Sequence, residues 1–136
     1  MSEHMLNLKF KGEVAKVPGA ERLNSCYLCG ICTACCPVAE VDESYNPRGM
    51  IQKVLYGMEE EILGSADLWK CTQCHNCVAH CPQDVRLADI IRALRIMAEE
   101  RGYVTPGLAE RVREIDEKSK LERLDQIANA VKALKG

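Results

Sequence analysis

Eight cysteines of this chain form two runs with the same spacing, and thiols at this spacing can bind iron–sulfur clusters. In each run, the first and second cysteines are separated by two residues, and so are the second and third. A fourth cysteine follows after three more residues and directly precedes a proline. The first run is Cys26, Cys29, Cys32 and Cys36, and the second run is Cys71, Cys74, Cys77 and Cys81. Every cysteine of the second run lies 45 positions after its counterpart, so the two runs form an internal repeat.

A [4Fe–4S] cubane needs four thiolates that approach its corners from different directions. One loop can supply three of them, because two intervening residues let successive sulfurs face inward. The proline holds the preceding cysteine extended and turns the chain away, and in two-cluster proteins that cysteine ligates the other cluster. We therefore predict two [4Fe–4S] clusters with crossed ligands. Cluster 1 is expected to bind Cys26, Cys29, Cys32 and Cys81, and cluster 2 to bind Cys71, Cys74, Cys77 and Cys36.

Zinc ligation and disulfide bonding are the alternative uses of these cysteines. Zinc also selects thiolates, but structural zinc sites present separated pairs of cysteines, and a third cysteine two residues further on would crowd one ion. The number of cysteines, nine, is odd, and residues 1–12 contain no apolar core of a signal peptide. No stretch approaches the roughly 20 apolar residues of a membrane span. We expect a cytoplasmic protein, where disulfides are rare.

The ninth cysteine and two histidines lie within the repeat but outside its ligand positions. Cys35 has no counterpart, because His80 takes its place in the second run. We expect a packed thiol here; a redox-active or substitute ligand would need exposure and a low pKa. His75 and His80 are expected to shape the surroundings of the clusters or the surface. Four basic residues could offset the cluster charge or be ordinary surface charges: Arg48, Lys53, Lys70 and Arg86.

The charge of the chain argues against nucleic acid and membranes as partners. The formal net charge is -2 with neutral cysteines, and eight thiolates with two cubane cores would bring it to about −6. An acidic chain without a basic, aromatic-rich stretch is not attracted to nucleic acid or to an anionic membrane surface. The sequence also lacks a glycine-rich nucleotide loop and a Ser/His/Asp constellation. We therefore predict no active site of its own and a non-catalytic role in electron transfer.

The elements that must position these cysteines are predicted to be helices. After a polar loop that follows Pro37, Asn46 can cap a helix whose first residue is Pro47, and apolar residues at helical spacing extend it over 47–57. A second helix is predicted at 59–63, followed by a turn capped by Ser65. Since this connection lacks the strand-forming alternation of a small bacterial ferredoxin, we predict an all-α fold, that of an alpha-helical ferredoxin.

A further amphipathic helix is predicted after the second run. Apolar residues recur at helical spacing from Val85 to Ala98, and the helix should continue to about Arg101, where Gly102 can end it. The charged residues between the apolar positions, Arg95 among them, are expected to form the polar face.

Both ends of the chain are predicted to extend the cysteine-binding domain. Apolar and polar residues alternate over 6–11, which predicts a short half-buried strand. Thr105 can cap a further helix, and residues 105–136 carry a broken apolar stripe that fits one long or two short amphipathic helices docked on a partner. We divide the chain into a two-cluster helical domain with an N-terminal extension, 1–104, and a C-terminal helical extension, 105–136.

Between Ser25 and Gly102 the sequence resembles the C subunit of heterodisulfide reductase, which is the small iron–sulfur protein of a soluble complex in methanogens and related anaerobes. The resemblance extends over more than half of the chain. It is carried by both cysteine runs and by three shorter segments around them: Asn46–Arg48, Asp67–Cys71 and Val85–Ile91.

The resemblance implies an alpha-helical ferredoxin fold and a role in methanogenesis. In that family, the small iron–sulfur protein passes electrons from a flavin-containing iron–sulfur subunit to the catalytic subunit that reduces the mixed disulfide of coenzymes M and B. That catalytic subunit is recognised by Cys-Cys-Gly motifs, whereas Cys35 and Cys36 precede Pro37 here. A cysteine at position 35 is not expected in that family. The chain could therefore belong instead to a related complex of sulfur metabolism or to a quinone-linked complex. A free dicluster ferredoxin and a zinc-stabilised scaffold are the remaining alternatives.

Overall fold

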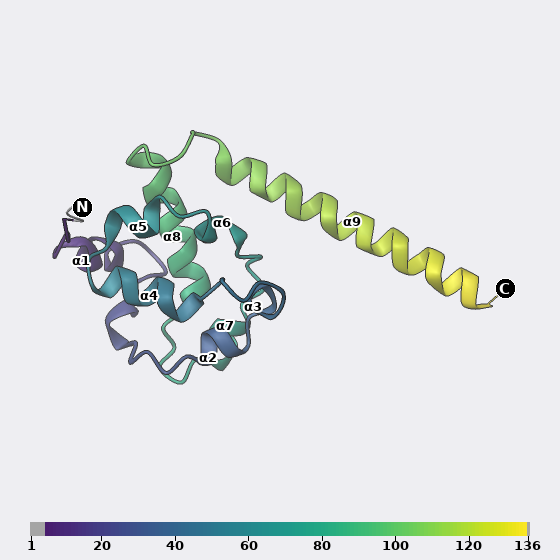
Figure 1. Ribbon diagram of the computed structural model, residues 1–136, viewed down its shortest axis with the longest axis horizontal. Helices are drawn as coiled ribbons and strands as arrows, with labels where there is room; N and C mark the ends of the chain where they lie inside the picture. Colours follow the sequence, from purple (N-terminus) through teal and green to yellow (C-terminus); the bar gives the residue numbers. More distant parts are fainter. Residues whose placement is uncertain (1–4, 136) are drawn as a thin grey trace.

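Helix α8 (Leu87–Glu100) lies against four shorter helices, and one long helix projects from the body that they form (Figure 1). The computed structural model describes residues 5–135, and the predicted all-α fold is confirmed, with no strand in this range. The other elements are α1 (Phe10–Ala15), the 3₁₀ helix η1 (Leu23–Ser25), α2 (Ile31–Ala34), α3 (Pro37–Val41), α4 (Pro47–Leu55), α5 (Glu59–Leu63), α6 (Asp67–Lys70), α7 (Asn76–His80) and α9 (Leu108–Lys135).

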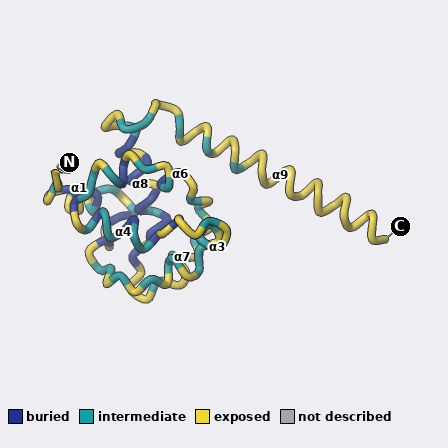
Figure 2. The backbone as a smooth tube through the Cα atoms, viewed as in Figure 1, coloured by how far each residue is buried: buried dark blue, intermediate teal, exposed yellow. Residues whose placement is uncertain are grey.

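Helix α8 forms the centre of the core. Its apolar residues from Leu87 to Ala98, except the exposed Ile96, are buried against α1, α5, α6 and α7, as the dark blue segment in Figure 2 shows. The helix starts two residues later than predicted because Arg86 is left-handed, with φ of 65°. At its other end Gly102 has φ of 75°, and the Tyr103 N–H donates to the carbonyl of Ala98 over 2.9 Å. This is the glycine-ended geometry expected there.

Helices α4 and α5 agree with the prediction for the segment between the two runs. The side chain of Asn46 accepts from the Gly49 N–H over 2.9 Å and caps α4, which ends at Leu55. The Ser65 hydroxyl accepts from the Asp67 N–H over 3.1 Å before α6. The polar loop predicted after Pro37 is wrong. The proline stands at the first position of α3, where its missing N–H and fixed φ favour a helix.

The short strand predicted at 6–11 is also wrong. Residues 7–9 form a turn and Phe10 begins α1, where its buried ring contributes to the core. The Asn7 N–H donates to the carbonyl of Gly57 over 2.8 Å, and the Asn7 side chain donates to Glu59 over 2.7 Å. A strand needs a neighbouring strand for its backbone groups, and the body offers this segment only the turn between α4 and α5.

Gly57→Ala should destabilise the protein through this contact. Gly57 has φ of 76°, and an added Cβ would overlap the carbonyl oxygen of Asn7. The left-handed backbone alone should cost about 1–2 kcal/mol, and the overlap should add to it. Gly12→Ala is the matched control, because it lies in α1 with no heavy atom near the new Cβ. Thermal melts of both variants test this, and equal melting temperatures would contradict it.

Helix α9 is a single helix of 28 residues, one of the two arrangements predicted for the C-terminal segment. It begins at Leu108, and the carboxylate of Glu99 on α8 accepts from the Ala109 N–H over 2.8 Å. Thr105 therefore does not cap it as predicted. Only its first turns contact the body, and from Glu117 onward every described residue is exposed (Figure 2). None of the helices within 5–135 is long and apolar enough to cross a membrane.

Candidate metal centre

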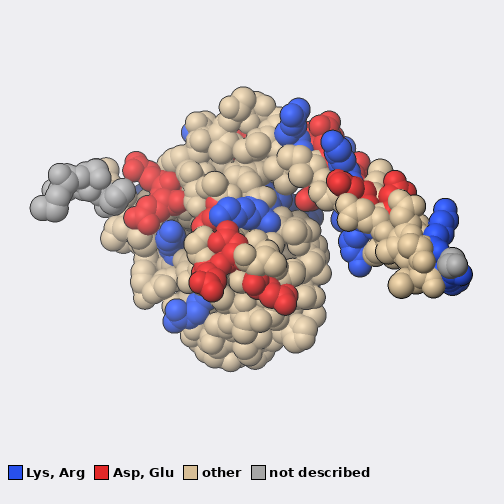
Figure 3. All heavy atoms as spheres, turned by 45° about the vertical axis from the view of Figure 1, so that its right-hand side comes forward, with Lys and Arg blue, Asp and Glu red and all other residues tan. Residues whose placement is uncertain are grey.

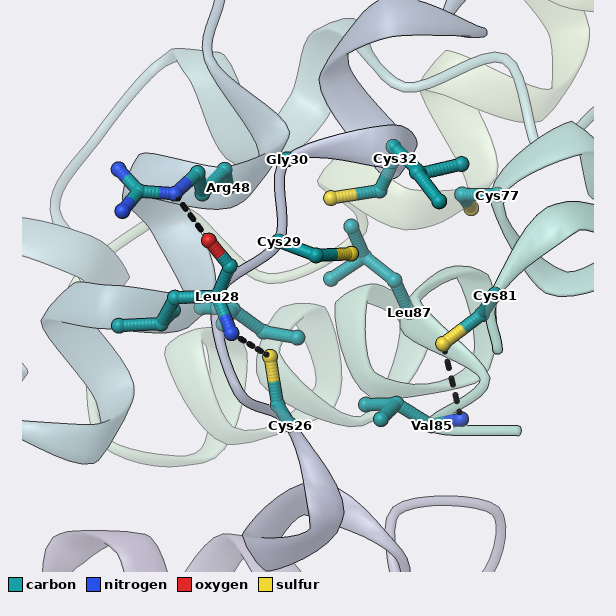
Figure 4. A pocket seen from close by; sticks show the side chains of 12 residues that line it. Cys26, Leu28, Cys29, Gly30, Cys32, Arg48, Cys77, Cys81, Val85 and Leu87 are labelled. Atoms are coloured by element: carbon teal, nitrogen blue, oxygen red, sulfur yellow. Dashed lines mark hydrogen bonds between the residues drawn. The ribbon is translucent and has the colours of Figure 1, made fainter. Parts of the chain in front are cut away.

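The four cysteines predicted to bind cluster 1 line one cavity. Figure 4 shows the sulfurs of Cys26, Cys29, Cys32 and Cys81 around a common space. Cys26 precedes the first loop, Cys32 lies on α2, and Cys81 arrives from the second run after α7. The remaining wall is mainly apolar and is formed by Leu28, Ile31, Ile51, Val85 and Leu87, with Gly30, Arg48 and Cys77.

The four cysteines predicted to bind cluster 2 line a second cavity. Cys71, Cys74 and Cys77 come from the second run, and Cys36 comes from the first run, between α2 and α3. Cys36 and Cys81 both have extended backbones before their prolines, with ψ of 123° and 121°. Each run thus sends its fourth cysteine into the cavity formed mainly by the other run.

The two cavities share a wall. Cys32, Cys77 and Leu87 line both of them. Cys32 lies on α2 and Cys77 on α7, two short helices that pack against each other, while Leu87 begins α8 behind them. Groups bound in the two cavities would therefore be separated by little more than these side chains.

The 45-residue repeat is also present in the backbone of the two cysteine loops. Leu28 and its counterpart Gln73 are left-handed, with φ of 60° and 56°, and so are Gly30 and its counterpart His75. These turns aim the Leu28 N–H at the Cys26 sulfur and the Gln73 N–H at the Cys71 sulfur, each over 3.4 Å. Hydrogen bonds to sulfur favour the thiolate form that a metal requires.

Burial raises the pKa of the two thiols on the shared wall. The pKa of Cys32 rises to about 11 and that of Cys77 to about 12, first because the apolar surroundings disfavour a thiolate. Thiols of this kind become thiolates when a cation compensates their charge. A cavity lined by four cysteines and apolar side chains therefore fits a cationic iron–sulfur core.

Of the four basic residues that flank the runs, Arg48 lines a cluster cavity. Its Nε donates to the carbonyl of Leu28 over 2.6 Å and supports the first loop. The other three form ion pairs with carboxylates instead: Lys53 with Glu61, Lys70 with Asp42 and Asp67, and Arg86 with Asp89. Of the two roles predicted for these basic residues, ordinary surface charge rather than compensation of the cluster charge therefore describes these three.

Cys35 lies outside both cavities. Its thiol donates to the carbonyl of Cys32 over 3.7 Å, and it lines a surface hollow beside Cys36 and Tyr45. Burial raises its pKa, which is the opposite of what a reactive thiol requires. His75 lines the second cavity, whereas His80 is exposed with its Nδ1 2.9 Å from the carbonyl of Asn76.

Three residues around the second cavity were not identified from the sequence. Tyr45 lines this cavity with 2% of its surface exposed, and burial raises its pKa well above the usual range. The Gln73 side chain donates to the Cys71 sulfur over 3.4 Å. Arg95 is buried at 9% exposure, although we predicted it on the polar face of its helix. The repeat could have revealed Gln73 as the counterpart of Leu28, but no local signal marks Tyr45 or Arg95.

Comparisons with known proteins agree with this site. Residues 22–85 match the family model described as a 4Fe-4S dicluster domain. The chain is 38% identical over 109 residues to the C2 subunit of the H(2)/formate:CoB-CoM heterodisulfide,ferredoxin reductase of Methanococcus maripaludis, covering 75% of this chain and 58% of that protein. It is 40% identical over 80 residues to the second iron–sulfur C subunit of the CoB–CoM heterodisulfide reductase of Methanocaldococcus jannaschii, covering 59% and 42%.

A third relative carries a more general name. A protein of Archaeoglobus profundus that is named as like the C subunit of heterodisulfide reductase is 36% identical over 98 residues, covering 71% of this chain and 51% of that protein. The chain spans about half the length of the curated relatives that it matches. The similarity to the C subunit is thereby confirmed, and [4Fe–4S] clusters are the cofactor that the matched domain binds.

Proposed function

We propose that this relative of the heterodisulfide reductase C subunit is a non-catalytic electron-transfer subunit. It would relay electrons from a flavin/iron–sulfur subunit to a disulfide-reducing catalytic subunit in a coenzyme M–coenzyme B heterodisulfide reductase complex, and so take part in methanogenesis. The observation that carries the proposal is the pair of four-cysteine cavities with a shared wall. Two one-electron carriers so close together suit a relay, and the names of the relatives supply the complex.

We assign two [4Fe–4S] clusters to the two cavities, with Cys26, Cys29, Cys32 and Cys81 holding cluster 1 and Cys71, Cys74, Cys77 and Cys36 holding cluster 2. When bound, each cluster accepts and releases one electron. The chain holds the ligands and excludes water: the Leu28 and Gln73 N–H groups donate to the Cys26 and Cys71 sulfurs, and the Val85 N–H lies 3.5 Å from the Cys81 sulfur. Cys29 and Cys74 are exposed, so each cavity has one ligand at the surface toward a partner.

We also propose that residues 1–104 are the cluster domain and that residues 105–136 dock a protein partner; residues 1–4 lie outside the described range. Beyond Glu117, α9 has no contact with the body. Its exposed apolar side chains follow helical spacing, with both signs of charge interspersed between them (Figure 3). They are Leu121, Leu124, Ile127, Val131 and Leu134. An exposed helix of this pattern is suited to a groove on another protein.

Anoxic co-purification tests the relay proposal. The wild-type chain, isolated from cells that make its partners, should elute with other redox subunits and contain about eight iron and eight sulfide per chain, as two cubanes require. A chain that is isolated only as a monomer would contradict the role in a larger complex. Stoichiometric zinc without iron would contradict the clusters.

A double change on α9 should separate docking from cluster binding. Leu124→Asp with Ile127→Asp places two charges on the exposed apolar side of α9 and should abolish co-purification while iron content stays unchanged, because this part of α9 lies away from both cavities. Gln126→Asp with Asn129→Asp, on the other side of the helix, is the matched control. Loss of partners in the control as well, or in neither variant, would contradict docking through this side.

A related complex is the second candidate. One relative is named only as similar to the C subunit, and Cys35 departs from the pattern expected of that family. The relay chemistry would be the same, in a heterodisulfide-reductase-like complex of sulfur metabolism or a quinone-linked complex. The identity of the co-purified proteins distinguishes the two candidates.

A further inference from the structure

Arg95 is the one buried charged side chain among residues 5–135. It lies on the core-facing side of α8, between buried residues such as Leu94 and Met97. A charge in such a place is costly unless its hydrogen bonds are satisfied. Desolvation lowers the pKa of Arg95, but a guanidinium stays protonated in proteins. The core therefore contains a permanent positive charge.

The partners of Arg95 belong to the segment that leads into the second cavity. Its Nε donates to the carbonyl of Leu68 over 2.9 Å, and one terminal nitrogen donates to the carbonyl of Cys71 over 2.8 Å. The guanidinium also lies 5.3 Å from the centre of the Trp69 ring. Leu68 lies within α6 and Cys71 directly follows it, so the planar guanidinium connects that helix to the first ligand of cluster 2.

No carboxylate pairs directly with Arg95 within the described part of the chain. The other arginines that form ion pairs do so with Asp or Glu at the surface, as Arg92 does with Asp89. The groups whose negative charge acts on Arg95 are the thiol of Cys71, the carboxyl of Asp116 on α9 and the hydroxyl of Tyr45. Carbonyl oxygens and an aromatic ring orient the guanidinium without cancelling its charge, so its field reaches the neighbouring cavity.

We propose that Arg95 is a positioning residue that holds the Cys71 loop and raises the reduction potential of cluster 2 more than that of cluster 1. The inference depends on the proposed cluster assignment. Reduction adds one negative charge to a cluster, and a nearby cation stabilises the reduced form. Burial strengthens this effect, because the effective dielectric is low and salt does not screen the charge. Burial and nearby groups are recognised determinants of cluster potential.

Redox titration monitored by electron paramagnetic resonance of the full chain tests the proposal. Arg95→Met, which removes the charge and keeps much of the volume, should shift one of the two midpoint potentials to a more negative value by clearly more than the other. Arg95→Lys should keep both potentials near those of the wild type, because the charge remains. Asp116→Asn should shift the same potential as Arg95→Met but in the positive direction. Arg92→Met, on the exposed side of α8, is the matched control and should shift neither.

Two further readouts assign the effect to cluster 2. In a Cys36→Ser background, which should lack cluster 2, Arg95→Met should shift the remaining potential by less than the larger of the two shifts measured with both clusters present. Trp69 is the sole tryptophan, so its fluorescence should change in Arg95→Met and not in Arg92→Met. This signal reports the Arg95 site without depending on electron transfer.

Several outcomes would overturn the proposal: equal shifts of both potentials in Arg95→Met, no shift at all, or the same shift in Arg92→Met. If Arg95→Met fails to take up cluster 2, the variants Arg95→Lys and Asp116→Asn test the proposal in its place. The proposal is supported if both midpoint potentials of Arg95→Lys match those of the wild type and one midpoint potential of Asp116→Asn is more positive. It is overturned if the midpoint potentials of Asp116→Asn equal those of the wild type. A wild-type chain with far fewer than about eight iron and eight sulfide would instead contradict the assignment of two clusters.

Discussion

Cys81→Ser should remove cluster 1 and leave cluster 2 in place, although Cys81 belongs to the second cysteine run. The physical reason is the path of the chain: Cys81 has an extended backbone before Pro82, and its side chain lines the cavity of Cys26, Cys29 and Cys32. A serine hydroxyl is a poor ligand for iron that prefers thiolate. Iron and sulfide should each fall from about eight to about four per chain, as expected when one of two cubanes is lost.

Two control variants make this result specific. Cys36→Ser should give the reciprocal loss, with cluster 2 missing and cluster 1 retained, because Cys36 lines the second cavity. Cys35→Ser should retain both clusters, since Cys35 lines neither cavity. Spectroscopy would contradict the crossed assignment if Cys81→Ser lost the cluster held by Cys71, Cys74 and Cys77 and kept the other.

Removal of iron should unfold most of the cluster domain. The two cavities are lined by residues that also belong to the core, including Ile51, Leu87 and Ile91. Removal of the metal also removes the binding free energy that it contributes to folding, which is on the order of 10 kcal/mol in small structural metal sites. This is comparable with the whole stability of a domain, about 5–15 kcal/mol.

Thermal melts of chelator-treated and cluster-loaded protein under anoxic conditions measure this effect. A loss of this size should lower the melting temperature by well over 10 °C, since about 1 kcal/mol corresponds to about 4–8 °C in a domain of 60–100 residues. Near-ultraviolet circular dichroism should show loss of ordered packing around Trp69. Iron and sulfide should restore the melt, whereas zinc should not. Equal melting temperatures of the treated and loaded protein would contradict a structural role of the clusters.

Helices with strong local signals were predicted correctly. The cap formed by Asn46, the proline that begins α4 and the glycine that ends α8 each act within one or two turns, so neighbouring residues suffice to recognise them. The prediction of a strand at 6–11 was wrong because a short alternation of apolar and polar residues does not form a strand without a neighbouring strand. The helix after Pro37 was missed because its five residues are too few to show helical spacing.

The candidate site was also predictable only where it depends on local sequence. The type and spacing of the cysteines come from the sequence, and they predict both the cofactor and the two sets of four. The sequence cannot predict that Cys32 and Cys77 form a shared wall, because this depends on how α2 and α7 pack. Arg95 shows the limit most clearly. Its charge and helical position favour a solvated face, whereas the structure buries it beside Cys71.

The sequence by itself determined the chemistry of this protein: thiol ligands at cubane spacing, a 45-residue repeat, and helices rather than strands between the ligands. These properties depend on residue types and on regular separations along the chain. Only the tertiary structure decided which side chains surround each cavity, how close the cavities lie, and where a buried charge stands. Burial and contact depend on segments that are distant in sequence, and their packing is cooperative, so no local pattern records them.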